Sequence, residues 1–162
     1  MDEVTTAELR ELVDKQRLYE LEARYCRAVD RADEELLRSC FHPEAIDEHG
    51  APEPIEGHIE YLRDHTLNPA VRPNPVQHAI TNALFEVEGD VAYGEVYNEV
   101  RRVDGGRQWI EGQGRYIDRF ERRDGEWRIA HRKVVVDFVA SDHYDEAKFI
   151  HSKRDRSDPS YR

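Results

Sequence analysis

Alternating tyrosines and glutamates mark one stretch of the chain where residue type and spacing suggest a site. The alternating residues are Tyr93, Glu95, Tyr97 and Glu99. In an extended strand, every second side chain lies on the same face. Such a face can line a wet pocket, or it can meet solvent or a second subunit. The positions between them carry mostly small or apolar residues, which is typical of a face turned to the core.

The other reactive residue types form no recognised motif. The two cysteines, Cys26 and Cys40, have no CxxC spacing, and the eight histidines are scattered without an HExxH. The glycines are dispersed, and no phosphate-binding loop is visible. We therefore expect two reduced, buried cysteines, no metal site and no cofactor.

Charge and length exclude several classes of protein. The 162 residues include 24 Lys and Arg against 35 Asp and Glu, for a net charge of −11. A binder of nucleic acid or anionic membranes needs a basic face. The longest stretch without a charged residue, 73–85, is shorter than the ~20 residues of a membrane span. The chain opens with no basic or apolar leader, so we expect a cytoplasmic protein.

The first part of the chain has helical periodicity. Apolar residues recur at three- and four-residue steps over 6–29, with Thr6 as the expected N-cap. A second short helix is predicted at 33–40 and a third at 57–66. The region between them is rich in proline and glycine, so it is expected to be a loop with at most a short strand at 45–47.

The second part of the chain has strand periodicity. Strands are predicted at 77–87, 91–103, 108–122 and 127–139, separated by glycine-containing turns. Helices followed by an antiparallel meander predict an α+β fold with the helices packed on one face of a curved sheet. We expect a single domain over 1–150 and a polar, mobile tail over 151–162.

Several segments, taken in order, resemble the SnoaL-like branch of the nuclear transport factor 2 (NTF2)-like superfamily. The segments that carry the resemblance are 25–33 (YCRAVDRAD), 38–43 (RSCFHP), 77–82 (QHAITN), 88–92 (EGDVA), 114–118 (GRYID), 124–129 (DGEWRI) and 131–132 (HR). The resemblance implies a cone in which a strongly curved, mostly antiparallel sheet wraps around a long helix and encloses a cavity. Members include enzymes and non-catalytic proteins, so the fold alone does not define the function.

The resemblance also implies a catalytic site. Cofactor-free lyases of this superfamily, such as scytalone dehydratase, hexachlorocyclohexane dehydrochlorinase and bile-acid 7α-dehydratase, use an Asp–His pair. Asp30 and His78 fall at the matching positions, and Tyr25 matches a catalytic tyrosine of the bile-acid enzyme. In this reading His78 is a general base, Asp30 orients it, and Tyr25 donates a proton or a hydrogen bond.

Each of these three residues also has a purely structural interpretation. Asp30 can cap the second helix, although Asp33 is better placed to do so. His78 can be a structural histidine, and Tyr25 lies on the apolar stripe of the first helix. Residues five apart on a helix point about 140° apart. Tyr25 and Asp30 therefore share a pocket only if the end of the helix points into it.

Further residues are expected to contact substrate. Arg132 could hold an oxyanion or a carboxylate, or it could equally form a surface or interface salt bridge. Asn82 could donate from the same strand face as His78, and His131 is a weak match for a second catalytic histidine. Four aromatic residues are candidates for the pocket wall, although core or interface packing is the favoured interpretation of each: Tyr61, Tyr97, Trp109 and Tyr116.

These expectations favour a cofactor-independent lyase, with dehydration of a hydrophobic aromatic, polyketide or steroid-like ring compound as its reaction. Retro-aldol cleavage of a C–C bond or a double-bond shift could use the same groups. A non-catalytic ligand-binding protein, or a partner resembling the small subunit of a dioxygenase, is the alternative from another class. The resemblance further implies a homo-oligomer, either a dimer or a trimer.

Overall fold

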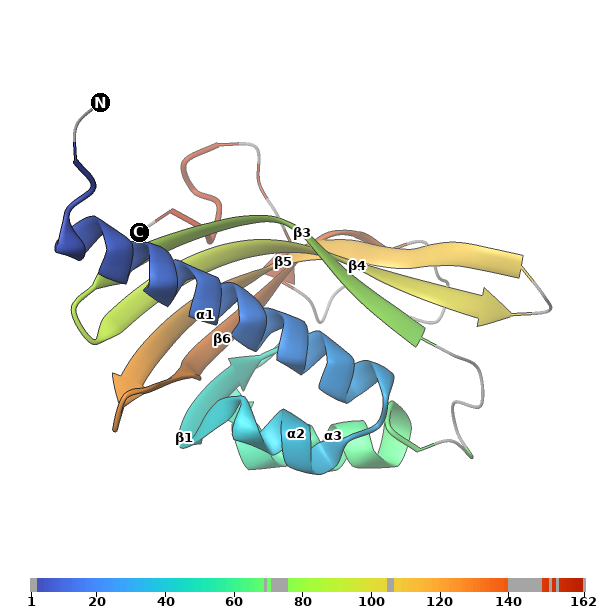
Figure 1. Cartoon of the computed structure of the whole chain (residues 1–162). Coiled ribbons are helices and arrows are strands. Elements are labelled where there is room, and N and C mark those ends of the chain that lie inside the picture. Colours follow the sequence, from blue (N-terminus) through green and yellow to red (C-terminus); the bar gives the residue numbers. More distant parts are fainter. Residues whose placement is uncertain are drawn as a thin grey trace.

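A computed structural model describes residues 3–68, 70, 76–104, 107–139, 150–151, 153 and 155–161. Helices pack against one face of a curved, open mixed sheet (Figure 1). The elements in chain order are α1 (Thr6–Asp30), α2 (Glu34–Ser39), β1 (Phe41–Glu48), β2 (Glu53–Pro54), α3 (Ile55–His65), β3 (Val76–Glu88), β4 (Val91–Asp104), β5 (Arg107–Arg123), β6 (Glu126–Val139) and β7 (Ile150–His151). The predicted α+β class is confirmed.

The helices begin where side chains can satisfy their first backbone N–H groups. The N-cap of α1 is Thr5, one residue before the predicted Thr6, and it forms a capping box with Glu8. Asp33 caps α2 by accepting a hydrogen bond from the Leu36 N–H at 3.0 Å. Because Asp33 fills this role, the carboxylate of Asp30 is free for other partners.

The sheet is built on the predicted antiparallel meander. Strands β3, β4, β5 and β6 pair in sequence, and β1 then adds to the free edge of β6 in parallel orientation. Two of the predicted turns are tight, with Gly89 and Gly125 at positive φ of 67° and 82°. The turn predicted at 104–106 lies in part outside the described residues.

The loop predicted after α2 is wrong in part, because β1 is an eight-residue strand. Pro43 lies within it, where the register with β6 shifts between Phe41 and Ile46. A proline cannot donate to the ladder, and an irregularity of this kind accommodates it. The strand ends at Glu48, and this position brings Asp47 into the interior of the fold.

The core lies between α1 and the concave face of the sheet. Leu18, Leu21 and Ala28 of α1 are fully buried, as are Val96 and Phe120 of the sheet. The first part of α1 departs from the predicted pattern, since Leu9, Leu12 and Val13 remain exposed. The long helix therefore packs mainly through its second half, against β3 and next to α2 (Figure 1).

Described residues of the expected polar tail at 151–162 contact the sheet. The short strand β7 pairs in parallel with β6. Further along, Asp158 is buried and receives hydrogen bonds from Arg115 at 3.0 and 2.9 Å. This ion pair attaches the end of the chain to the outer side of β5. Among the described residues, no helix is both long and apolar enough to cross a membrane.

Candidate functional site

Asp30 and His78 meet at the end of α1, where the helix lies over the start of β3. Asp30 Oδ1 lies 2.8 Å from His78 Nδ1 and 2.9 Å from the backbone nitrogen of the same residue. Each side chain is 12% exposed. The carboxylate therefore holds both the ring and the main chain of His78 in one position.

The protonation pattern of this pair follows from the hydrogen bond. An ionised carboxylate can only accept, so the neutral His78 ring donates from Nδ1–H to Asp30. The second ring nitrogen, Nε2, then carries the lone pair. A histidine held in this way can take a proton through Nε2 while the carboxylate stabilises the resulting cation.

His78 lines a pocket of about 690 Å³ between the helices and the sheet. This volume falls in the usual range for small-molecule sites. The apolar part of the wall comes mainly from Val29, Leu62, Val100, Val134 and Val136. Such a lining suits a hydrophobic molecule with few polar groups.

Asn98 is a polar residue of the pocket that the sequence analysis placed only on a core face. It pairs with Ile80 in the ladder next to His78, and its Nδ2 is buried without a hydrogen-bond partner among the described residues. Gly114 lies opposite Asn98 on β5, where a Cβ would collide with the carbonyl oxygen of Val135. Asn98 therefore lines the pocket and carries a buried amide nitrogen that has no partner among the described residues.

Tyr25 and Tyr116 contribute aromatic wall to the same pocket. Their rings meet edge to face at 5.5 Å, and both are buried. Burial raises the pKa of Tyr25, and the opposing charge of Arg132 does not offset it. The phenol of Tyr25 thus keeps its proton and is suited to donate a hydrogen bond.

Arg132 does not line the pocket, so its predicted role in binding substrate is not supported. It is fully buried beneath the two tyrosines, with its guanidinium 4.1 Å from the Tyr25 ring centre and 4.0 Å from that of Tyr116. Glu22 and Asp118 accept its hydrogen bonds at 2.6 to 3.2 Å. Arg132 joins α1 to the sheet and supports the tyrosines from below.

Asn82 is also misplaced by the sequence analysis, because of an irregularity in β3. The pairing with β4 shifts between Ile80 and Ala83. An extra residue at such a bulge reverses the faces of the positions that follow. Asn82 is consequently exposed and lies outside the pocket, whereas His78 and Ile80 keep the inward face.

The remaining predicted contacts divide between the pocket and the outside. Tyr61 lines the pocket beside His58. Tyr97 lies on the outer face of β4 and is 40% exposed, and His131 contacts Glu48 at 2.7 Å instead of the pocket. Tyr97 and His131 therefore lie outside the pocket. The side chain of Trp109 lies outside what the structure describes.

Both cysteines are buried and free, as expected. Burial is the main cause that raises the pKa of Cys26 to about 12 and that of Cys40 to about 11. A thiol held protonated in this way is a poor nucleophile. Neither cysteine is therefore a candidate for covalent catalysis.

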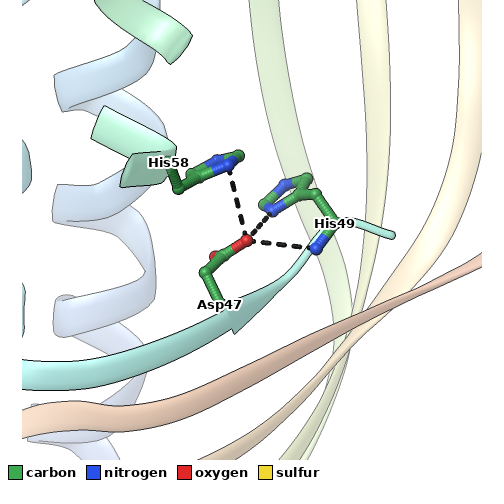
Figure 2. Close-up of side chains that lie close together, drawn as sticks. All are labelled: Asp47, His49 and His58. Atoms are coloured by element: carbon green, nitrogen blue, oxygen red, sulfur yellow. Dashed lines mark hydrogen bonds and ion pairs between the residues drawn. The ribbon is translucent and has the colours of Figure 1, made fainter. Parts of the chain in front are cut away.

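A second polar group in the pocket was missed by the sequence analysis. Asp47, His49 and His58 converge from the end of β1, the residues after it and the start of α3 (Figure 2). Both histidines line the same pocket as His78. The only signal in the sequence is the Asp-x-His spacing of Asp47 and His49, because His58 joins them through the fold.

Comparison with known proteins agrees with this geometry. A family model described as SnoaL-like domain matches residues 10–133. No curated protein matches the chain. A solved structure of Rv3472 from Mycobacterium tuberculosis, a protein of unknown function, is 32% identical over 81% of this chain and 80% of its own, with a TM-score of 0.70.

Two structures from Novosphingobium aromaticivorans also match. An NTF2-like protein with a cystatin-like fold is 26% identical, covering 91% of this chain and 96% of that one, with a TM-score of 0.72. A protein provisionally described as a scytalone dehydratase is 16% identical, covering 86% and 94% of the two chains, with a TM-score of 0.70. This last similarity shows the fold alone.

Proposed function

The chain belongs to the SnoaL-like family of NTF2-like folds, and from that premise we propose that it is a lyase that removes water from a hydrophobic ring compound by acid–base chemistry. The observation that carries the proposal is the hydrogen bond of 2.8 Å between Asp30 and His78, which leaves Nε2 of a pocket-lining histidine free. Positioned general bases of this kind contribute roughly 10²–10⁴-fold to rate.

The proposed reaction begins at a carbon next to a carbonyl. Nε2 of His78 takes the proton from that carbon, and Asp30 stabilises the imidazolium that forms. The free amide of Asn98 and the phenol of Tyr25 donate hydrogen bonds to the developing enolate oxygen. These two donors come from β4 and α1, so the pocket holds the oxygen between helix and sheet.

Collapse of the enolate completes the elimination. The C–O bond at the β-carbon breaks, the C=C bond forms, and the proton held by His78 leaves with the hydroxide as water. Atoms and electrons balance with side chains alone in this scheme. A retro-aldol cleavage or a double-bond shift begins with proton transfer by the same base, so the products identify which bond changes.

The walls of the pocket define the class of substrate. The cavity of about 690 Å³ has valine and leucine side chains on its walls and two tyrosine rings at one side. A compound of fused rings with a carbonyl and a β-hydroxyl would fit in it and meet its few polar groups. We propose substrates of this class, as aromatic, polyketide or steroid-like intermediates.

The test measures proton abstraction before any substrate is known. The protein is incubated in D₂O with a panel of cyclic β-hydroxyketones, and NMR and mass spectrometry follow deuterium uptake and loss of water. Wild type should catalyse exchange or elimination with at least one compound, and His78→Ala should reduce the rate at least ~10²-fold. His131→Ala, which alters a histidine outside the pocket, is the matched control.

The alternative is a binding protein with no reaction of its own. It predicts that panel compounds bind with unchanged protons and that His78→Ala changes affinity alone. If wild type binds ring compounds tightly and exchanges no proton, the lyase is excluded.

The outer sheet face supports the proposal of a homo-oligomer. Leu84 is 73% exposed and Tyr97 is 40% exposed on neighbouring strands of this face. Exposed apolar residues that lie together are typical of subunit contacts. Sedimentation should show a dimer or trimer, and Leu84→Glu should shift it to monomer. A wild-type monomer would overturn this proposal.

A further inference from the structure

Three potential metal ligands lie together at the side of the pocket formed by β1 and α3. Asp47, His49 and His58 each offer one ligand atom, and these atoms lie within 4.8 Å of one another. Asp47 Oδ1 is 2.6 Å from His49 Nδ1 and 3.5 Å from His58 Nδ1 (Figure 2). The two imidazole rings stack with their centres 4.2 Å apart.

Burial leaves two polar atoms of this group without partners. Asp47 is fully buried and His58 is 3% exposed. In the part of the chain that the structure describes, Asp47 Oδ2 and His58 Nε2 have no hydrogen-bond partner. Buried polar atoms are normally satisfied, so two such atoms in one cluster need an explanation. A cation bound by both carboxylate oxygens of Asp47 would supply a partner for Oδ2, whereas His58 Nε2 lies across the ring from the Nδ1 that faces Asp47 and needs a separate partner.

The hydrogen bond inside the group defines what an ion must displace. Asp47 Oδ1 and His49 Nδ1 are 2.6 Å apart, so a proton lies between them. Because metal ligands must be deprotonated, binding of an ion releases this proton.

The surrounding charges also favour a cation. Glu53 Oε1 lies 3.5 Å from His58 Nδ1 and adds a second carboxylate at the edge of the group. Arg132, a buried positive charge that acts on both Asp47 and His58, is itself paired with Glu22 and Asp118. The group therefore offers negative charge to an ion that enters from the pocket.

We propose that Asp47, His49 and His58 bind a divalent first-row transition cation. Two imidazoles and one carboxylate form a donor set that suits zinc, iron, cobalt and nickel and discriminates against magnesium and calcium. The remaining coordination positions would face the pocket that His78 also lines. An ion there can polarise an oxygen of the substrate.

This inference goes beyond the lyase proposal and does not depend on it. The proton abstraction assigned to Asp30 and His78 uses no metal. The sequence analysis predicted no metal site because it searched for linear motifs, whereas these ligands come from two separate segments, the end of β1 and α3. Binding can therefore be tested without substrate.

The test titrates the chelator-treated full chain with Zn²⁺ by calorimetry, and with Co²⁺ by visible absorption. One ion per chain should bind with micromolar affinity or better, and Mg²⁺ should not compete. X-ray absorption of the zinc form should show two imidazoles and oxygen ligands near ~2.0–2.1 Å. His49→Ala and His58→Ala should each weaken binding at least ~10-fold.

Two further variants separate a specific site from general histidine binding. Asp47→Asn should weaken binding as the histidine variants do, and circular dichroism checks that each variant folds. His131→Ala, with the histidine outside the pocket, should bind Zn²⁺ like wild type. No binding by wild type at 1 mM Zn²⁺, or equal binding by all variants, would overturn the proposal; X-ray absorption without imidazole ligands would do so independently of any variant.

Discussion

Asp30 and His78 lie 48 residues apart in the sequence, yet one carboxylate oxygen contacts both the ring and the backbone nitrogen of that histidine. The helix end and the first residues of β3 are thereby fixed to each other beside the pocket that His78 lines. Nε2, the ring nitrogen of His78 that does not contact Asp30, is the atom to which we assign proton transfer.

The tautomer of His78 provides a test that needs no substrate. In wild type, the neutral ring should carry its proton on Nδ1, because Asp30 accepts from that atom. Nitrogen-15 NMR of labelled histidine distinguishes the two tautomers. Asp30→Ala should shift the population toward Nε2–H, and a wild-type ring already protonated on Nε2 would contradict the assigned role.

Replacing Asn98 should separate activity from stability. Asn98→Leu removes a donor to the enolate, and loss of one such donor costs roughly 10²–10³-fold in kcat. Its buried Nδ2 has no partner among the described residues, so urea unfolding should show little loss of stability. Asn82→Leu is the control, because Asn82 is exposed and lies outside the pocket.

Arg132 should matter for stability, and Glu22 should make that stability depend on pH. Arg132→Ala leaves two buried carboxyl groups uncompensated, which costs about 3–5 kcal/mol. Burial raises the pKa of Glu22 well above its ordinary 4.5, although Arg132 opposes this. A carboxyl group whose pKa is higher in the folded than in the unfolded protein stabilises the fold at pH values below its unfolded pKa. This stabilisation is lost as pH rises.

The variant Glu22→Gln tests this sign. The neutral amide of the variant cannot ionise. The free energy of unfolding of the variant should therefore increase relative to that of wild type as pH rises above about 4.5. Urea unfolding at several pH values measures the difference. A gain of wild type over the variant with rising pH would show that Glu22 is held as a carboxylate.

The end of the chain should loosen when Asp158 is neutralised. The hydrogen bond from Arg115 is the main cause that lowers the pKa of Asp158, so this pair contributes stability at neutral pH and loses it in acid. Asp158→Asn should speed proteolysis within 150–161 by about tenfold at pH 7. Asp155→Asn, an exposed change in the same segment, should not.

Periodicity allowed most of the fold to be predicted, because helix and strand spacings differ clearly along this chain. The errors lie where a local irregularity overrides the pattern. Pro43 suggested a loop, but a register shift accommodates it inside β1. Asn82 was assigned inward, but the bulge after Ile80 turns it outward.

The candidate site was predicted less completely than the fold. Asp30, His78 and Tyr25 were found through resemblance to a family, and the structure brings Asp30 and His78 together and places His78 and Tyr25 at one pocket. The buried position of Arg132 was not predicted, because the sequence does not reveal that Glu22 and Asp118 are buried beside it as ion-pair partners. Asn98 and His58 were missed since only the folded sheet and α3 bring them to the pocket.

The most direct test of the central claim is a double-mutant cycle of Asp30→Ala and His78→Ala, measured by deuterium exchange of the fastest substrate in the panel. If Asp30 acts through His78, each single change reduces the rate, and the double variant is no slower than His78→Ala within about threefold. If the two losses multiply, or if His78→Ala exchanges at the wild-type rate, the pair is not the catalytic base.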